Sequence, residues 1–132
     1  MHCVRCGLCC QETEMLLSEN DIGRIERIGY DAKRFVRIDK TSYAKLRNTQ
    51  KHCVFYNPAK KECLIYDKRP EGCRIYPVVF DYSTGIAVDE TCSERNSVSY
   101  QEQAETGLQV KSLLARIDKE AQKRARKKSR KA

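Results

Sequence analysis

The segment Cys3-Val4-Arg5-Cys6-Gly7-Leu8-Cys9-Cys10 brings four thiols into eight residues, and this density determines how the rest of the chain is interpreted. Four further cysteines follow singly, so the 132-residue chain holds eight. Core packing does not require so many thiols, and clustered spacing is typical of metal ligands. We therefore expect all eight to bind metal, namely Cys3, Cys6, Cys9, Cys10, Cys53, Cys63, Cys73 and Cys92.

The surroundings of the first cysteine indicate the cellular compartment. No stretch approaches the ~20 apolar residues that cross a bilayer, and no apolar segment precedes Cys3. We expect a cytoplasmic protein without membrane contact, where thiols stay reduced unless a metal binds them. The alternatives are buried structural thiols, or disulfides of the kind that hyperthermophiles keep inside the cell.

The spacing of the cysteines bears on the choice of metal. A C-x2-C-x2-C run supplies three thiolates to one 4Fe-4S cluster in bacterial ferredoxins, whereas structural zinc more often uses two separated C-x2-C pairs. The spacing thus favours an iron-sulfur cluster, with zinc as the alternative. The match is incomplete, because the proline after the fourth ferredoxin cysteine and a second run are both missing.

Eight thiolates are enough for two four-thiolate sites. We expect Cys3, Cys6 and Cys9 to share one centre and Cys10 to turn towards a second, because successive side chains of an extended backbone point to opposite sides. Each site keeps a net charge of about −2, which nearby donors and cations must offset. Four residues next to or near cysteines are candidates for this role, with a solvated surface position as the alternative: Arg5, His52, Arg69 and Arg74.

Two stretches together resemble one family. The opening motif resembles the C-x2-C-G-x-C-C start of the YkgJ-type cysteine-cluster proteins, also described as the CxxCxxCC zinc- or iron-chelating domain. The stretch Cys63-Leu64-Ile65-Tyr66-Asp67-Lys68-Arg69-Pro70-Glu71-Gly72-Cys73-Arg74-Ile75-Tyr76-Pro77 is similar to that family's C-x-I-Y-x2-R-P-x2-C-R-x-Y-P. With Cys53 and Cys92, the resemblance spans residues 3–92. It implies a metal-chelating domain, usually labelled iron-sulfur with zinc as the rival, and it implies no reaction.

The remaining patterns predict an α+β fold, a small irregular metal-stabilised domain with short hairpins. Ser18 and Asp21 form a capping-box-like start for a helix that ends at Gly29, and a short second helix follows over residues 31–36. Strand-like stretches predict hairpins over residues 43–66 and 75–88. Between them, a proline and a glycine suit the first turn and the end of a short helix, Pro70 and Gly72 respectively.

The C-terminal part should be a long helix from about Ser97. Its apolar face comprises Ala104, Leu108, Val110, Leu113, Leu114, Ile117 and Ala121, and Gly107 weakens it by up to ~1 kcal/mol. Residues 119–132 hold eight lysines and arginines against Glu120, a charge of +7, which leaves 8 − 7 = +1 for residues 1–118. We divide the chain into a cysteine-cluster domain, residues 1–96, and a helix with a flexible basic tail, residues 97–132.

Two classes of function fit these features. The first is an iron-sulfur protein that serves electron transfer, sensing or structure, with an electron-transfer or protein partner. The second is a zinc-stabilised module whose tail binds RNA or DNA weakly and without sequence preference, because the tail offers cations but no aromatic side chain to stack on bases. An enzyme has the least support, since no phosphate loop or nucleophile-base pair is visible.

Overall fold

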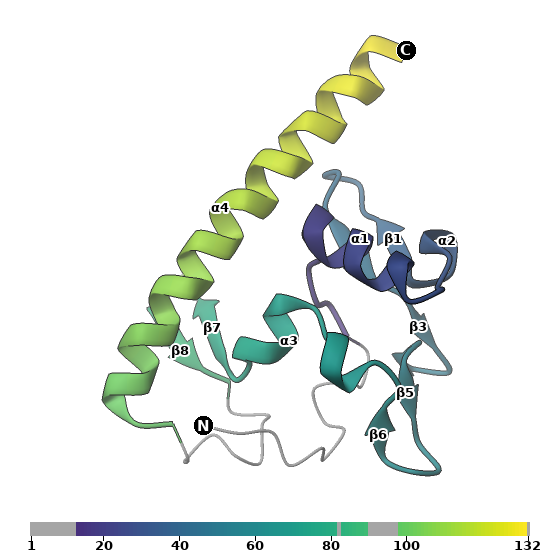
Figure 1. Cartoon of the computed structure of the whole chain (residues 1–132). Coiled ribbons are helices and arrows are strands. Elements are labelled where there is room, and N and C mark those ends of the chain that lie inside the picture. The colour runs from purple at the N-terminus through teal and green to yellow at the C-terminus, as the bar shows by residue number, and fades with distance from the viewer. Residues whose placement is uncertain (1–12, 82, 90–97, 132) are drawn as a thin grey trace.

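A computed structural model describes residues 13–81, 83–89 and 98–131, with side chains up to Lys128 (Figure 1). The elements alternate between short helices and short strands before one long helix. In chain order they are α1 (Glu19–Arg27), α2 (Ala32–Phe35), β1 (Val36–Ile38), β2 (Ala44–Leu46), β3 (Asn48–Thr49), β4 (His52–Cys53), β5 (Tyr56–Asn57), β6 (Glu62–Cys63), the 3-10 helix η2 (Tyr66–Lys68), α3 (Glu71–Ile75), β7 (Val78–Asp81), β8 (Gly85–Val88) and α4 (Tyr100–Lys131). The predicted small α+β domain is confirmed.

Within the described ranges, the strands form four separate two-stranded antiparallel sheets. The pairs are β1 with β2, β3 with β4, β5 with β6 and β7 with β8. Hairpins β5–β6 and β7–β8 confirm the two predicted hairpin regions, residues 43–66 and 75–88, whereas β1 lies outside both. Two-stranded hairpins are marginally stable by themselves, so each depends on its packing against the rest of the domain.

Helix α1 begins where the sequence predicts. The Ser18 hydroxyl accepts a hydrogen bond from the Asp21 amide at 3.1 Å, and the Asp21 carboxylate accepts one from the Ser18 amide at 3.0 Å. This reciprocal capping box satisfies two amide donors of the first turn. The helix ends before Gly29, whose φ of 105° lies in the left-handed region that glycine adopts without strain.

The Asp21 carboxylate also joins α1 to the start of α3. It is fully buried, and its Oδ1 atom accepts hydrogen bonds from Arg24 Nη2 at 2.8 Å and from the Glu71 amide at 3.0 Å. The residue that precedes Glu71, Pro70, provides no side-chain cap for α3. Asp21 therefore supplies in trans the cap that α3 lacks.

A glycine in α3 corrects one prediction. Gly72 lies inside the helix rather than at its end. A Cβ atom there would meet the Met15 sulfur at 2.4 Å, so the missing side chain allows the segment around Met15 to pass close to α3. Glycine at this position permits a tertiary approach and does not terminate the helix.

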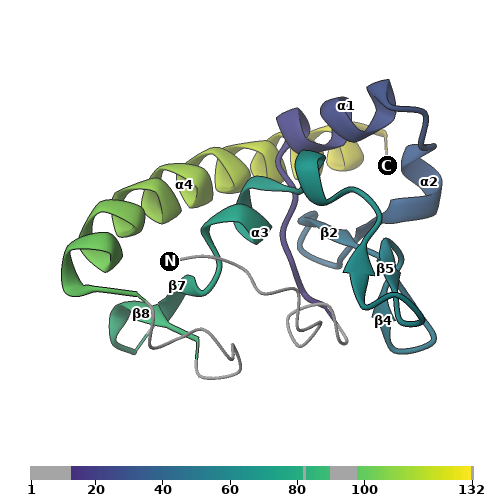
Figure 2. The same ribbon diagram turned by 60° about the horizontal axis from the view of Figure 1, so that its bottom comes forward.

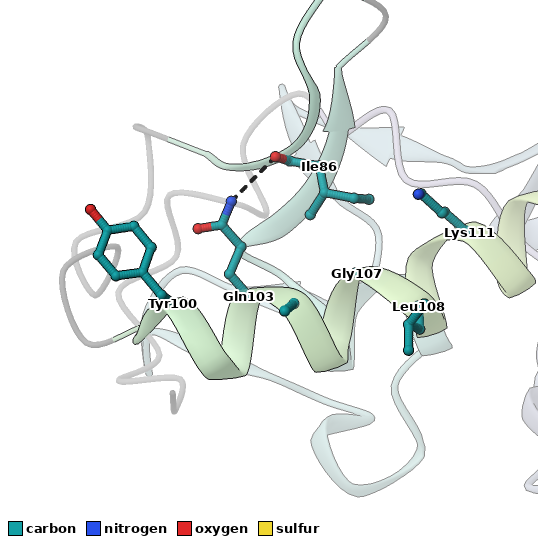
Figure 3. A pocket seen from close by; sticks show the side chains of 7 residues that line it. Ile86, Tyr100, Gln103, Gly107, Leu108 and Lys111 are labelled. Carbon is teal, nitrogen blue, oxygen red and sulfur yellow. Dashed lines mark hydrogen bonds between the residues drawn. The ribbon is translucent and has the colours of Figure 1, made fainter.

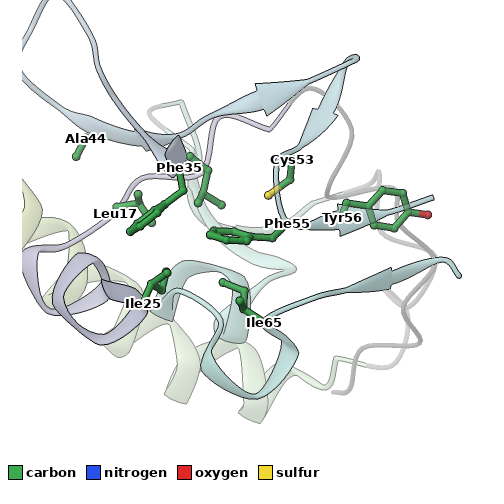
Figure 4. Packing of buried hydrophobic residues seen from close by; sticks show 9 residues of the cluster. Leu17, Ile25, Phe35, Ala44, Cys53, Phe55, Tyr56 and Ile65 are labelled. Carbon is green, nitrogen blue, oxygen red and sulfur yellow. The ribbon is translucent and has the colours of Figure 1, made fainter. Parts of the chain in front are cut away.

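The main apolar core lies between α1, α2 and the first three hairpins (Figure 4). Two ring contacts organise it, since the ring centroids of Phe35 and Phe55 lie 5.5 Å apart and Tyr30 meets Phe55 edge-on at 5.0 Å. Such offset and edge-on pairs add to the stabilisation from buried area. The buried members are Leu17, Ile25, Phe35, Ala44, Leu46, Cys53, Phe55, Tyr56 and Ile65.

Helix α4 crosses the molecule as one continuous helix, with α3, β7 and β8 beside its first half (Figures 1 and 2). Val110, Leu113, Ile117 and Ala121 are buried, as the apolar pattern predicts. The prediction is wrong for Ala104 and Leu108, which are exposed. Gly107 is buried in their place, because its missing side chain lets Ile86 approach to 3.0 Å from where a Cβ would stand.

The second half of α4 is attached to the body by polar contacts. The Arg124 guanidinium donates to the Ser42 carbonyl at 3.0 Å and pairs with the Glu19 carboxylate. The Tyr43 hydroxyl donates to Asp118. The backbone remains helical to Lys131, and among the described side chains of α4, which end at Lys128, the last buried one is that of Ala121. The expected flexibility of this end remains a prediction.

We expect Asp21→Ala to destabilise the fold by about 3 to 5 kcal/mol, because it leaves the Arg24 cation and two amides without their buried acceptor. Asp31→Ala is the matched control, since it removes an exposed cap that accepts a hydrogen bond from the Lys33 amide, and its loss costs about 1 kcal/mol. Urea unfolding of the metal-loaded variants measures both. Equal losses for the two variants would contradict the central role of Asp21.

Candidate metal centre

Three of the eight predicted ligands lie in the described part of the chain. Cys53 ends β4, Cys63 ends β6 and Cys73 lies in the middle of α3. The five others fall outside the described residues, namely Cys3, Cys6, Cys9, Cys10 and Cys92.

The fold brings these three cysteines to one core. Cys53 is buried among the core side chains (Figure 4), and Cys63 and Cys73 are half-buried and pack against the same cluster. The three cysteines are ten residues apart in sequence, so the folding of the hairpins and α3 brings them together.

Hairpin β5–β6 fixes the position of Cys63. Its register places Cys63 opposite Tyr56, and the following Leu64 amide donates to the Phe55 carbonyl at 2.8 Å. Both partners belong to the buried core. The Cys63 backbone is therefore fixed by core residues and not by the exposed turn of the hairpin.

The turn between Cys63 and Cys73 is built by arginines. Arg69 Nε donates to the Tyr66 carbonyl at 2.9 Å, and its guanidinium carbon lies 3.9 Å from the centroid of the Tyr66 ring. Arg74 Nη2 donates to the Asp67 carbonyl at 3.1 Å. Arg69 thus stabilises the end of η2, and Arg74 ties α3 to η2, each by binding a backbone oxygen, a structural reason for the Arg-Pro-x2-Cys-Arg pattern.

His52 makes contacts of its own next to Cys53. Its Nδ1 atom lies 3.0 Å from the Cys53 carbonyl oxygen, and its ring meets the Tyr56 ring edge-on with centroids 5.7 Å apart. A carbonyl only accepts, so Nδ1 is the protonated nitrogen in this arrangement. Nδ1 is thereby occupied, and Nε2 is the nitrogen left for any further interaction.

The segment that follows the N-terminal cysteines is anchored beside Cys53. The Thr13 amide donates to Asn48 Oδ1 at 2.9 Å, and Asn48 Nδ2 donates back to the Thr13 carbonyl at 3.0 Å. Asn48 is the strand partner of Cys53. Thr13 therefore lies at the hairpin that carries a predicted ligand.

The same segment then passes α3 near Cys73. Met15 packs against Gly72, the residue before Cys73, and the Leu46 amide donates to the Met15 carbonyl at 3.0 Å. Glu14 binds Arg37 and Lys45 at 3.0 Å, and the hydrogen bond from Lys45, with that from Arg37, lowers the pKa of the Glu14 carboxyl. This segment is held along β2 by backbone and ionic contacts together.

The segment that follows α3 is also held by hydrogen bonds. The Asp89 amide donates to the Pro77 carbonyl at 2.8 Å, and the Tyr76 hydroxyl donates to Asp89 Oδ2 at 2.7 Å. Tyr76 is the residue that directly follows α3. Asp89, which directly follows β8 and lies three residues before Cys92, is thus tied to the end of the helix that carries Cys73.

No set of three or more histidine, cysteine, aspartate or glutamate side chains within residues 13–81, 83–89 and 98–131 is arranged to hold a metal ion. Any four-thiolate site would therefore include at least one cysteine from residues 1–12 or 90–97. Thiols are the donors that zinc and iron-sulfur clusters prefer, so the residues present fit either group. None of the helices in the described ranges is long and apolar enough to span a membrane.

These features define a small α+β domain in which hairpins and a short helix bring cysteines from separate segments to one core. The family model CxxCxxCC, described as a putative zinc- or iron-chelating domain, matches residues 2–106, and the chain belongs to this family. Among curated proteins and solved structures, none matches the chain. The match includes every cysteine and ends within the first turns of α4, so the basic half of α4 lies outside it.

Sequence reasoning missed several residues that position the cysteines. Asn48 and Met15 carry no recognisable signal, because their roles depend on contacts between distant segments. The start of α4 did carry one: Ser99 and Glu102 have capping-box spacing, and the Glu102 amide donates to the Ser99 hydroxyl at 3.1 Å.

We expect Cys63→Ser to lose bound metal and cooperative thermal unfolding together. A structural metal supplies an apparent ~10 to 16 kcal/mol to a small domain, more than the usual net stability, so removing one ligand should remove most of the cooperativity. Glu62→Ser in the same strand is the matched control and should keep both properties. Metal analysis and calorimetry are the measurements, and Cys73→Ser should behave like Cys63→Ser. Full metal content with unchanged melting in either cysteine variant would remove that residue from the ligand set.

Proposed function

We propose that this protein binds 4Fe-4S-type iron-sulfur clusters through its eight cysteines and uses them for electron transfer, sensing or structure. The observation that carries the proposal is the path of residues 13–17, which runs from the hairpin of Cys53 to the helix of Cys73. This path directly follows the cysteine-rich opening stretch.

Chain length supports the convergence of the thiols. Cys10 precedes Thr13 by three residues, a span of at most about 11 Å of extended chain. Cys92 follows Asp89 by the same number of residues, and Asp89 is bonded to Tyr76 and Pro77. Each of these two cysteines is therefore tethered within reach of a described cysteine segment.

Ligand number and spacing support the choice of cluster. The C-x2-C-x2-C run matches the ferredoxin pattern, and eight thiolates suffice for two four-thiolate sites. A site with four thiolates has no open coordination position for a substrate, which favours electron transfer, sensing or structure over catalysis. A reducing compartment such as the cytoplasm would keep the thiols available, and an electron-transfer or protein partner would complete such a role. Zinc is the alternative occupant.

Anaerobically isolated protein should be brown, should bleach on reduction with dithionite, and should contain iron and acid-labile sulfide in equal amounts, up to about eight of each per chain for two clusters. Absorption spectroscopy with iron, sulfide and zinc analysis tests this. Colourless protein with stoichiometric zinc from a host supplied with iron would defeat the cluster proposal and favour the zinc module.

A second candidate function concerns the basic end of α4. Arg124 is bound to Glu19 and Ser42, yet the neighbouring cations Lys119, Lys123, Arg126, Lys127 and Lys128 are exposed on a helix whose base is fixed to the body. A fixed base reduces the entropy that the tail loses when it meets a polyanion. This favours weak binding of RNA or DNA phosphates without sequence preference.

Replacing Lys123, Arg126, Lys127 and Lys128 with glutamine should weaken nucleic-acid binding and reduce the slope of log K against log salt by about 3, since each phosphate contact contributes about 0.7 to 0.9. The matched control replaces four other exposed cations, Arg27, Lys33, Arg34 and Lys60, and should leave the slope unchanged. Fluorescence anisotropy with a single-stranded oligonucleotide measures both. Unchanged binding by the first variant would move any such site away from α4.

A further inference from the structure

One face of α4 is exposed along most of the described helix. Its positions recur at intervals of three or four residues, so at 3.6 residues per turn they share roughly 100° of the helix circumference. We call this set the α4 stripe, and all of its members are exposed: Tyr100, Ala104, Leu108, Lys111, Ala115, Lys119, Gln122 and Arg126. The stripe therefore places an aromatic ring and several cations on one surface.

The aromatic end of the stripe is open to solvent. Tyr100 is 93% exposed and Leu108 is 70% exposed, although burial would be favourable for side chains of this size. Figure 3 shows the Tyr100 ring pointing away from the helix, at one end of a groove of about 350 Å³ whose other end is marked by Lys111. None of the described carboxylates lines this groove.

The cations of the stripe have no ionic partner among the described residues. Lys111, Lys119 and Arg126 take part in none of the ion pairs between described side chains. The carboxylates of α4 lie off the stripe and accept hydrogen bonds from their own chain, Glu102 from the Ser99 amide, Glu105 from Gln101, Asp118 from Tyr43 and Glu120 from the Glu19 amide. The charge of the stripe is therefore complementary to a polyanion.

We propose that the α4 stripe binds single-stranded nucleic acid, with an unpaired base stacked on the Tyr100 ring and the phosphates of the strand at Lys111, Lys119 and Arg126. The proposal rests on the second candidate function, the binding of phosphates by the basic end of α4, and extends it to the bases. Proteins that bind single strands combine a positively charged track with aromatic rings, because every base has a face that can stack.

The dimensions of the stripe fit such a strand. With a rise of 1.5 Å per residue, Lys111 lies about 16 Å along the helix from Tyr100, and Lys119 and Arg126 follow at intervals of about 12 and 10 Å. The whole stripe is about 39 Å long, which at 3.4 Å or more per nucleotide corresponds to at most about 11 nucleotides. This lies within the range of about 4 to 16 nucleotides that single-strand binding folds cover.

The exposed ring of Tyr100 favours a single strand over a duplex. Paired bases already stack on their neighbours, so a duplex presents phosphates and groove edges but no free base face. An unpaired base presents such a face. The basic residues 119–132 contain no aromatic side chain, and the other end of the same helix supplies one on the same surface.

Fluorescence anisotropy with the metal-loaded full chain tests the proposal. The labelled ligands are a single strand of about 20 nucleotides, an abasic strand of equal length and charge, and a duplex. The strand with bases should bind at least about fivefold more tightly than the abasic strand, because stacking of one base contributes at least that factor. DNA and RNA strands of one sequence are compared, and the tighter of the two identifies the source of the ligand.

Tyr100→Ala should lower the affinity for the strand with bases about fivefold or more, to that of the abasic strand, and should leave duplex binding unchanged. Tyr100→Phe keeps the ring and should bind as the native chain does. Ile38→Ala, at a 54% exposed position on β1, is the matched control and should have no effect. Because Tyr100 is exposed, its replacement should leave thermal unfolding unchanged.

The joint replacement of Lys111 and Lys119 by glutamine should reduce the slope of log K against log salt by about 1.4, since each phosphate contact to a single strand contributes about 0.7. An unchanged slope would overturn the stripe as the path of the strand. Equal binding of the strands with and without bases, or native affinity of Tyr100→Ala, would overturn the stacking site and leave phosphate binding by the basic end of α4 intact. If the native chain bound no strand at all, this proposal and the second candidate function would both be overturned.

Discussion

The buried carboxylate of Asp21 is the interaction on which the arrangement of the described segments depends. One side chain, fully removed from water, accepts from two backbone amides and one guanidinium. A buried charge is tolerated only with such partners. Because the amides belong to Ser18 and Glu71, the same carboxylate fixes the start of α1 and the start of α3. Arg24 extends the link, since its guanidinium also donates to the Arg69 carbonyl at 2.9 Å.

Helix α4 joins this framework at several points along its length. Arg116 binds Glu71 at 2.8 Å, directly at the residue whose amide Asp21 accepts, and Arg124 reaches Glu19 in the first turn of α1. These ionic contacts are partly exposed, so each contributes modestly. Apolar burial of Val110, Leu113 and Ile117 supplies the larger share of the attachment. The helix therefore braces α1 and α3, and with them the segment that carries Cys73.

The cysteines occupy positions that this framework holds from several sides. Cys53 lies in the core, Cys63 is opposite a buried tyrosine, and Cys73 lies on a helix capped by a residue from a different helix. A domain of this size buries a small apolar core, and within the described ranges its strands form four separate hairpins. A bound metal would add coordination bonds between segments that otherwise share little buried apolar surface.

Features that depend on neighbouring residues could be predicted before the fold was known: the capping box of Ser18 and Asp21, the two hairpin regions, the long C-terminal helix, and the cysteine motif that places the chain in its family. Local hydrogen bonding and side-chain periodicity encode these directly. Which distant segments contact one another could be learned from the three-dimensional structure alone. The sequence pattern indicated that Gly72 ends a helix and that Gly107 weakens one. In the structure the missing side chain of each glycine makes room for a side chain from a distant segment, Met15 beside Gly72 and Ile86 beside Gly107. The trans cap from Asp21 to α3 and the exposure of Leu108 likewise depend on pairs of residues far apart in sequence, and no local pattern records such contacts.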